Sequence, residues 1–305
     1  MIRTAVIGLG TMGPGMLATL VRSGMAVTAF DVSAEQRDKA GPAMAGAAQV
    51  LDALGMPDKS VAESPRIVDS LADCVAGADL VIENVPEKLE IKTALFQELD
   101  ALVHETCVLA SDTSGIPITK LQVGVSAPGR VVGMHWSNPP HIIPIIEVIA
   151  GAETSPETID WMVKTVKGLN MLPILVKQDV PGFVENRILY AIMREAVDLV
   201  EKGVIDAESL DSCVSWGIGY KLAVIGPMAL LDMAGLDIYE SVSSYLNEDL
   251  CARKDVSALI AGKTAEGSLG LKSGKGMFDY RPEQIGELRA ARAKKLVAVR
   301  KALEA

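Results

Sequence analysis

The sequence predicts an α/β protein in which a doubly wound, mainly parallel sheet is followed by an all-α C-terminal domain. Short apolar runs recur over the first 150 residues without polar alternation, and this indicates strands buried on both faces. Segments with helical spacing of apolar residues separate the runs, which is the pattern of a parallel sheet covered by helices. From about residue 183 onward the pattern is almost wholly helical.

The expected strands are short apolar segments that end near a glycine or a polar residue. They comprise residues 4–8, 26–30, 79–83, 107–110, 130–134 and 145–149. Residues 87–103 carry leucine, isoleucine and phenylalanine at helical spacing and predict a helix. Another helix begins at Ser155 and Pro156, because serine is a favoured N-cap and proline a favoured first residue, and it ends at Gly168.

The character of the chain changes near residues 178–182. A chain of 305 residues exceeds an average domain, so two domains are the natural expectation. We therefore expect residues 1–180 to form the first domain and residues 181–305 the second. Within the second, residues 183–245 indicate helices with Gly203 as a C-cap, and a glycine-rich stretch at 267–276 precedes a terminal basic helix.

Composition excludes several classes of function. A formal net charge of -10 and a pI near 4.9 argue against a nucleic-acid partner, which requires a basic face. No apolar run approaches the roughly 20 residues of a membrane span, so we expect no membrane partner. The cysteines are scattered without metal-ligand spacing, which predicts reduced thiols, a cytoplasmic protein and no metal: Cys74, Cys107, Cys213 and Cys251.

A glycine motif follows the first expected strand directly. It fits the pattern G-x-G-x-x-G and contains Gly8, Gly10, Thr11, Met12 and Gly13. Between a strand and a helix, this is the dinucleotide-binding fingerprint of a Rossmann domain, in which the glycines permit a tight turn and close approach of the pyrophosphate. Asp31 ends the next strand, where a carboxylate accepts hydrogen bonds from the adenosine ribose and repels the phosphate of NADP. The sequence therefore predicts NAD as the cofactor.

One of the three histidines carries a functional signal. His135 lies at the carboxyl end of an expected strand, where open α/β sheets place their ligands. Glu147 belongs to the next apolar run, and a buried carboxylate needs a partner, for which His135 is the obvious candidate. Such a pair is a general base oriented by a carboxylate. From spacing alone, a catalytic pair and a purely structural pair stay equally open.

Taken together, the motifs resemble the L-3-hydroxyacyl-CoA dehydrogenase family over essentially the whole chain. The matching stretches are residues 8–13, 85–92, 112–114, 133–139, 147–149, 179–187, 226–232 and 272–274. The resemblance implies an NAD-dependent dehydrogenase with a Rossmann domain and a helical domain for substrate binding and dimerisation. It also implies a homodimer formed through the C-terminal helices.

The resemblance assigns roles to single residues. His135 matches the family's catalytic histidine and Glu147 the partner that orients it. Ser114 and Asn186 match the serine and asparagine of the substrate site, which bind the reacting oxygen and hold the site closed. The remaining matches are to cofactor-contacting residues, namely Glu87, Lys92, Asn138 and Lys272.

Three departures from the family pattern favour a small substrate without CoA. Asp112 stands where the family has asparagine, and residues 220–226 form a longer segment than in acyl-CoA members. No lysine or arginine lies between Lys39 and Lys59, where acyl-CoA enzymes bind the phosphorylated adenosine of CoA. Segments 111–117, 135–141 and 215–221 are instead similar to a superfamily member that oxidises an aldehyde on a carboxylated pyridine. We therefore expect a small carboxylated substrate. Trp136 or Trp216 could offer a planar wall to a ring, although a tryptophan is more often simply part of the core.

Three other readings stay open. The same residues would serve a 3-hydroxybutyryl-CoA dehydrogenase. The glycine motif also resembles the 3-hydroxyisobutyrate dehydrogenase family, although residues 217–221 do not reproduce the spacing of that family's lysine. A non-catalytic dinucleotide-binding protein is the alternative of another class, and the joint presence of His135, Glu147, Ser114 and Asn186 argues against it.

Overall fold

The computed structural model describes residues 1–61 and 64–305. The chain forms two compact units. The first contains residues 1–187 together with 296–301, and the second contains residues 188–295 together with 302–305. Each unit is described separately below.

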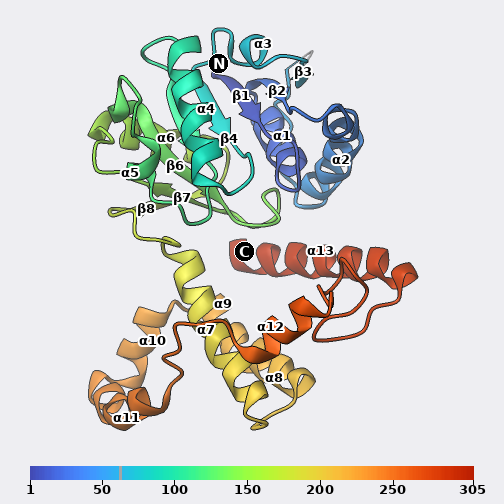
Figure 1. Ribbon diagram of the computed structural model, residues 1–305, viewed down its shortest axis with the longest axis vertical. Helices are drawn as coiled ribbons and strands as arrows, with labels where there is room; N and C mark the ends of the chain where they lie inside the picture. Colours follow the sequence, from blue (N-terminus) through green and yellow to red (C-terminus); the bar gives the residue numbers. More distant parts are fainter. Residues whose placement is uncertain (62–63) are drawn as a thin grey trace. The chain divides into compact units, whose positions relative to one another are not determined.

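The first unit is built on an eight-stranded sheet with the order β3-β2-β1-β4-β5-β6-β7-β8 (Figure 1). All neighbouring strands are parallel except the antiparallel pair β6–β7. The strand order reverses beside β1, and such a switch point is where doubly wound sheets bind ligands at the carboxyl ends of their strands. The predicted doubly wound, mainly parallel sheet is confirmed. The strands are β1 (Arg3–Ile7), β2 (Ala26–Phe30), β3 (Arg66–Ile67), β4 (Leu80–Glu83), β5 (Val108–Ser111), β6 (Val131–Trp136), β7 (Ile145–Ile149) and β8 (Leu172–Val176).

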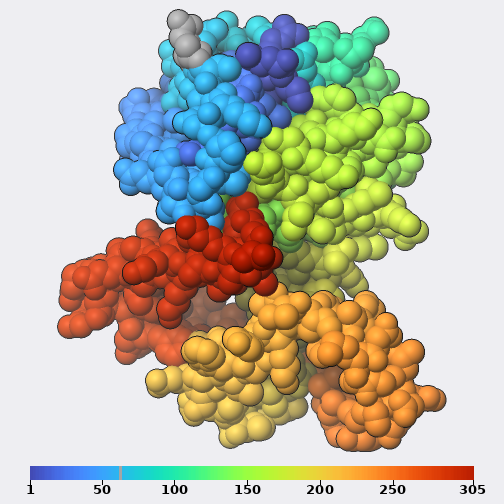
Figure 2. Space-filling model, turned by 180° about the vertical axis from the view of Figure 1, so that it is seen from behind, coloured from blue at the N-terminus to red at the C-terminus, as the bar shows by residue number. Residues whose placement is uncertain are grey.

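Helices cover both faces of this sheet. Buried side chains of α1 and α6 share one core cluster with the sheet, on the face seen in Figure 2, and those of α3, α4 and α5 share the other. α2 contributes only Ala40 to the first cluster and packs mainly on α1, where Ala47 and Leu51 meet Ala18. Their amphipathic spacing explains the arrangement, because each helix buries one apolar stripe. The helices are α1 (Gly13–Arg22), α2 (Ala34–Ala53), α3 (Leu71–Val75), α4 (Leu89–Leu102), α5 (Ile118–Leu121) and α6 (Pro156–Gly168), with a 3₁₀ turn at Pro128–Arg130.

The sequence analysis did not predict strands β3 and β8 or the antiparallel direction of β7. β3 has only two residues, and β8 contains Pro173 and exposes Leu172, Ile174 and Leu175, as suits the edge of a sheet. Neither has a buried apolar pattern that would mark a strand. β7 runs antiparallel to β6 because residues 137–144 form no helix, and a parallel connection requires a crossover of a dozen or more residues.

The second unit is helical. Its elements are α8 (Ala207–Cys213), a π-helical turn (Val214–Gly219), α9 (Tyr220–Val224), α10 (Pro227–Ala234), α11 (Leu236–Asp249), α12 (Ala258–Ala265) and most of α13 (Pro282–Glu304). α7 (Glu185–Glu201) begins in the first unit and ends before Gly203, whose positive φ of 69° suits the predicted C-cap. Across the described residues, no single helix has the length and apolarity of a membrane span, although the bent pair 207–224 and 227–234 meets that test by composition.

Candidate active site

The glycine turn joins β1 to α1. Gly8 has φ of 100°, and a Cβ on it would lie 2.3 Å from the carbonyl oxygen of Asn84, so only glycine fits. A Cβ on Gly13 would lie 2.8 Å from the carbonyl oxygen of Gly8. By contrast, no atom in the described part of the chain lies within 4 Å of a Cβ built on Gly10. The turn is thus tight on the side of the sheet and open where the amides at the start of α1 can meet a pyrophosphate.

Asp31 lies beneath this turn at the end of β2. Its Oδ2 accepts a hydrogen bond from the Leu9 amide at 2.7 Å and its Oδ1 one from the Ser33 amide at 2.8 Å. Arg37 donates to the carbonyl oxygen of Asp31 at 2.7 Å, and its guanidinium lies 3.3 Å from the Asp69 carboxylate. A fixed carboxylate beside an open glycine turn fits the ribose and pyrophosphate of NAD.

His135 and Glu147 face each other across the antiparallel strands β6 and β7. The Nδ1 atom of His135 lies 2.8 Å from Oε2 of Glu147, and both side chains are buried. Oε1 of Glu147 accepts hydrogen bonds from the amides of Val184 and Glu185, at 3.0 and 3.1 Å. Because Glu147 engages Nδ1, the ring nitrogen left for a ligand is Nε2 of His135.

The charges around this pair favour a protonated imidazole. Burial alone lowers the pKa of His135, but the hydrogen bond to Glu147 and the charges of Asp112, Glu147 and Glu185 together raise it above its ordinary value. Burial likewise opposes ionisation of Glu147, yet its hydrogen bonds from His135 and from two backbone amides hold its pKa below the usual range. The pair is therefore arranged to accept a proton on His135 and to stabilise the resulting cation.

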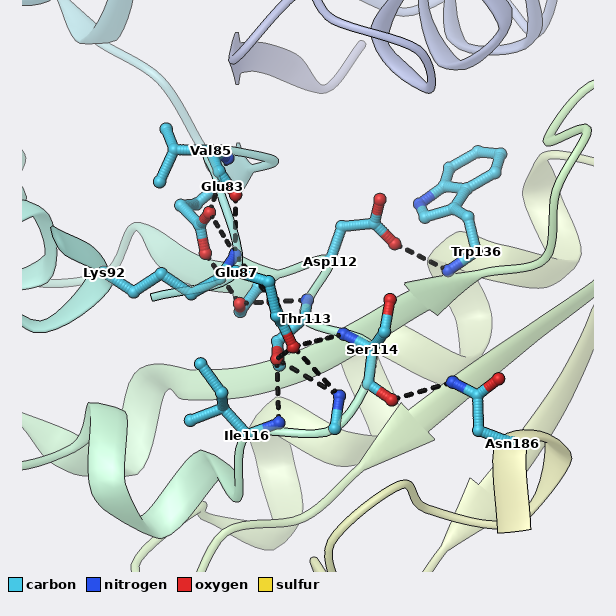
Figure 3. A network of polar contacts seen from close by, with 12 residues as sticks. Glu83, Val85, Glu87, Lys92, Asp112, Thr113, Ser114, Ile116, Trp136 and Asn186 are labelled. Carbon is cyan, nitrogen blue, oxygen red and sulfur yellow. Dashed lines mark hydrogen bonds and ion pairs between the residues drawn. The ribbon is translucent and has the colours of Figure 1, made fainter. Parts of the chain in front are cut away.

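A second network fixes the loop after β5 (Figure 3). Oε1 of Glu87 accepts hydrogen bonds from the Thr113 hydroxyl at 2.6 Å and from the Ser114 amide at 3.0 Å. Lys92 lies 3.5 Å from the other oxygen of Glu87 and donates to Glu83 at 2.6 Å. Glu83 and Lys92 are both fully buried. This ion pair thus sets the position of Glu87, and Glu87 sets that of Ser114.

The start of α7 is tied to the same loop. The side-chain amide of Asn186 donates to the carbonyl oxygen of Ser114 at 2.8 Å (Figure 3). Asn186 directly follows the backbone amides that bind Glu147. Four residues that the sequence analysis assigned to catalysis therefore belong to two linked hydrogen-bond networks: His135, Glu147, Ser114 and Asn186.

Other predicted site residues have different surroundings. Lys92, which the resemblance assigns to the cofactor, forms an ion pair with the buried carboxylate of Glu83. Asn138 is exposed and lies just beyond the end of β6. Lys272 is an exposed residue of the helical unit. Trp136 is only 2% exposed and belongs to the core, so it offers no wall to a ligand, while Trp216 is 79% exposed.

The sequence analysis did not predict that three polar residues gather near His135, namely Asp112, Ser137 and Glu185. Glu185 accepts a hydrogen bond from the Ser137 hydroxyl at 2.6 Å. Asp112, noted only as a departure from the family, accepts one from the Trp136 amide at 2.8 Å. Ser137 follows His135 by two residues, just beyond the end of β6, and this spacing is a sequence signal that could have pointed here.

Metal-ligating residue types do gather at this point. One ligand atom from each of His135, Glu147 and Glu185 lies within 4.8 Å of the others. Two of these side chains are already joined by the hydrogen bond between His135 and Glu147. The expectation of a site without metal stays a prediction.

Comparison with known proteins places both parts of the chain in one family. Residues 3–180 match the NAD-binding domain of 3-hydroxyacyl-CoA dehydrogenase, and residues 182–280 match the C-terminal domain of the same enzyme. The 3-hydroxybutyryl-CoA dehydrogenase of Bradyrhizobium diazoefficiens is 35% identical over 92% of this chain and 95% of its own length.

A second relative is similar over the full length. The 5-formyl-3-hydroxy-2-methylpyridine 4-carboxylate 5-dehydrogenase of Mesorhizobium japonicum is 59% identical, covering 100% of this chain and 99% of the relative. A crystal structure of an enzyme of that name, described as an NAD⁺-dependent dismutase, has a TM-score of 0.96 and 59% identity over 100% of this chain and 99% of its own. The expected cofactor and fold are confirmed. The chain is an NAD-dependent dehydrogenase that belongs to the 3-hydroxyacyl-CoA dehydrogenase family.

Proposed function

We propose that this protein oxidises the aldehyde of 5-formyl-3-hydroxy-2-methylpyridine-4-carboxylate to the dicarboxylate, with His135 as the base. The observation that carries the proposal is the buried His135–Glu147 pair at the carboxyl end of β6. The choice of substrate is supported by the similarity over the full chain to the 5-formyl-3-hydroxy-2-methylpyridine 4-carboxylate 5-dehydrogenase.

The residues of the chain account for the proton transfer. NAD, bound at the glycine turn, supplies the hydride acceptor. An aldehyde hydrate carries a hydroxyl on the reacting carbon, as a secondary alcohol does. Nε2 of His135 accepts the proton of that hydroxyl, and Glu147 stabilises the imidazolium that forms. The Ser114 hydroxyl and the Asn186 amide hold the reacting oxygen.

A hydrate route requires no cysteine nucleophile. The described thiols nearest to the sheet are unsuited to that role, because burial raises the pKa of Cys74 to about 12 and that of Cys107 to about 11. A thiol is nucleophilic as the thiolate, so neither would react at neutral pH.

The competing function is oxidation of a 3-hydroxyacyl-CoA, which the 3-hydroxybutyryl-CoA relative favours. The composition of α2 and of the turn after this helix argues against a CoA substrate, because the segment between Lys39 and Lys59 contains no lysine or arginine. Arg37, at the start of the helix, is engaged with Asp69. A multiply charged nucleotide requires cationic contacts that this segment does not provide.

A substrate comparison tests the proposal. NADH formation from the pyridine aldehyde is measured beside NADH consumption with acetoacetyl-CoA. We expect turnover of the aldehyde and a loss of roughly 10²–10⁴-fold in His135→Ala, with NAD binding retained. The matched control His104→Ala changes an exposed histidine and should leave turnover unchanged. Efficient use of the thioester with an inert aldehyde would establish the CoA function instead.

We also propose that the helical part, residues 181–305, binds substrate and forms a homodimer, while residues 1–180 carry the cofactor. In the helical unit, none of the large apolar side chains that the structure describes at positions 188–295 is buried. Helices in proteins owe most of their stability to burial of an apolar face. A second copy of the chain would supply that burial.

A further inference from the structure

Glu185 contributes a second carboxylate to the surroundings of His135. Its Oε1 accepts a hydrogen bond from the Ser137 hydroxyl at 2.6 Å, and Ser137 is itself buried. The other oxygen, Oε2, is buried and has no hydrogen-bond partner among the residues that the structure describes. A buried acceptor without a donor is costly, so its environment has to compensate in another way.

The compensating group lies close by. Ligand atoms of His135, Glu147 and Glu185 are within 4.8 Å of one another. At such a distance an opposite charge stabilises an ionised group even without a hydrogen bond. Glu147 already occupies the Nδ1 position of His135, so Glu185 acts by charge and not by a bond to that atom.

We propose that Glu185 is a positioning residue of the dehydrogenase, a second anion that Ser137 fixes beside His135 and that stabilises the imidazolium formed when His135 accepts a proton. The inference rests on the proposed role of His135 as base. Glu147 then orients the ring, and Glu185 strengthens its hold on the proton.

Among the residues that the structure describes, three acids and one ring face His135. Asp112 extends from the end of β5, Glu147 from β7 and Glu185 from the start of α7. The Phe183 ring lies with its centroid 5.9 Å from that of the imidazole and carries no charge. All three acids act in the same direction and raise the pKa of His135 against the effect of burial. Removing the charge of Glu185 alone therefore lowers it.

The test is a histidine titration by NMR on the whole protein without cofactor or substrate. The chain has three histidines, so the signal of His135 is assigned as the one that His135→Gln removes. We expect Glu185→Gln to move the inflection of His135 to lower pH, each full unit corresponding to roughly tenfold in proton affinity. Glu185→Asp should restore part of the shift. Glu98→Gln, which removes an exposed carboxylate on α4, is the matched control and should leave the inflection in place.

Ser137→Ala provides a second, milder variant. It keeps the charge of Glu185 but removes the hydroxyl that fixes it, so a smaller shift in the same direction is expected. An unchanged titration of His135 in folded Glu185→Gln overturns the inference. If that variant does not fold, an unchanged titration in Ser137→Ala does the same. A downward shift combined with normal turnover in His135→Ala would sustain the electrostatic coupling and refute the proposed base.

Discussion

Asp112 makes the free energy of unfolding depend on pH. It is buried at the end of β5, and burial raises its pKa from an ordinary value of 3.8 to about 7, although the Trp136 amide and the charge of His135 oppose the rise. The folded protein therefore retains this proton in a pH range where the unfolded chain has lost it. Protonation stabilises the fold at acid pH, and that contribution is lost as the pH rises from about 4 to about 7.

Asp112→Asn should remove this dependence. Asparagine retains an oxygen for the Trp136 amide and carries no charge, so the variant should gain stability over the original protein. The difference should grow by about 1.4 kcal/mol per pH unit up to about pH 7 and then level off. Urea unfolding at pH 5, 6, 7 and 8 measures it. Asp160→Asn, at an exposed position of α6, should show no such trend, and an equally flat result for Asp112→Asn would contradict the assigned burial effect.

Residue patterns revealed part of the site and concealed the rest. Asp31 and His135 stand at the ends of readable strands, and the need of a buried Glu147 for a partner correctly pointed to His135. Glu185 has no such signal. It lies at the start of a helix that reads as amphipathic, and only the approach of α7 to β7, through the amides bound by Glu147, brings its carboxylate inward.

The connection between β4 and β5 depends on a buried ion pair. Glu83, the last residue of β4, and Lys92, in the first turns of α4, are joined at 2.6 Å in the core. Oε2 of Glu83 also accepts a hydrogen bond from the Ser111 hydroxyl at 2.7 Å, on the neighbouring strand. The ion pair thus fixes α4 against β4 and β5 at the carboxyl ends of these strands, where the loop with Ser114 begins. The cofactor contact that the family resemblance implies for Lys92 stays a prediction. Neither spacing nor composition shows that this lysine is also buried.

Lys92→Met should destabilise the protein strongly. Methionine retains the volume of the side chain but leaves the charge of Glu83 buried without its partner, a change that costs about 3–5 kcal/mol. Urea unfolding without NAD measures this independently of cofactor binding. Lys39→Met interrupts only the exposed pair with Glu35 on α2 and should leave the unfolding midpoint in place. Equal midpoints for both variants would show that the buried pair contributes nothing.

Sequence patterns predicted most strands of the sheet but neither their direction nor the edge strand β8. Six strands were readable because continuous apolar runs require burial on both faces. Strand direction was not readable, and the antiparallel turn from β6 to β7 is what places His135 opposite Glu147. The edge strand β8 was not predicted, because an exposed strand does not need a continuous run of apolar residues.

The two units of the chain differ in how much apolar surface each of them buries. The sheet unit has two large core clusters, one on each face. The helical unit exposes apolar side chains instead, and α11 is the clearest case. Its exposed residues include Leu236, Ile238, Tyr239, Val242, Tyr245 and Leu246. Contiguous exposed apolar surface of this kind marks an interaction site, and an obligate homodimer interface resembles a domain core divided in two.

A homodimer should therefore form at micromolar concentration. Sedimentation equilibrium is expected to give twice the 32.2 kDa of one chain. Tyr245→Glu places a charge in the apolar surface of α11, where Tyr245 is 61% exposed, and burying that charge without a partner is costly. The variant should dissociate and lose helical signal at 222 nm, since the helices then lack a packing partner. Asn247→Glu adds the same charge on a polar position of α11 and should stay dimeric. A monomeric original protein with full helicity would show that the helical unit is stable without a second chain.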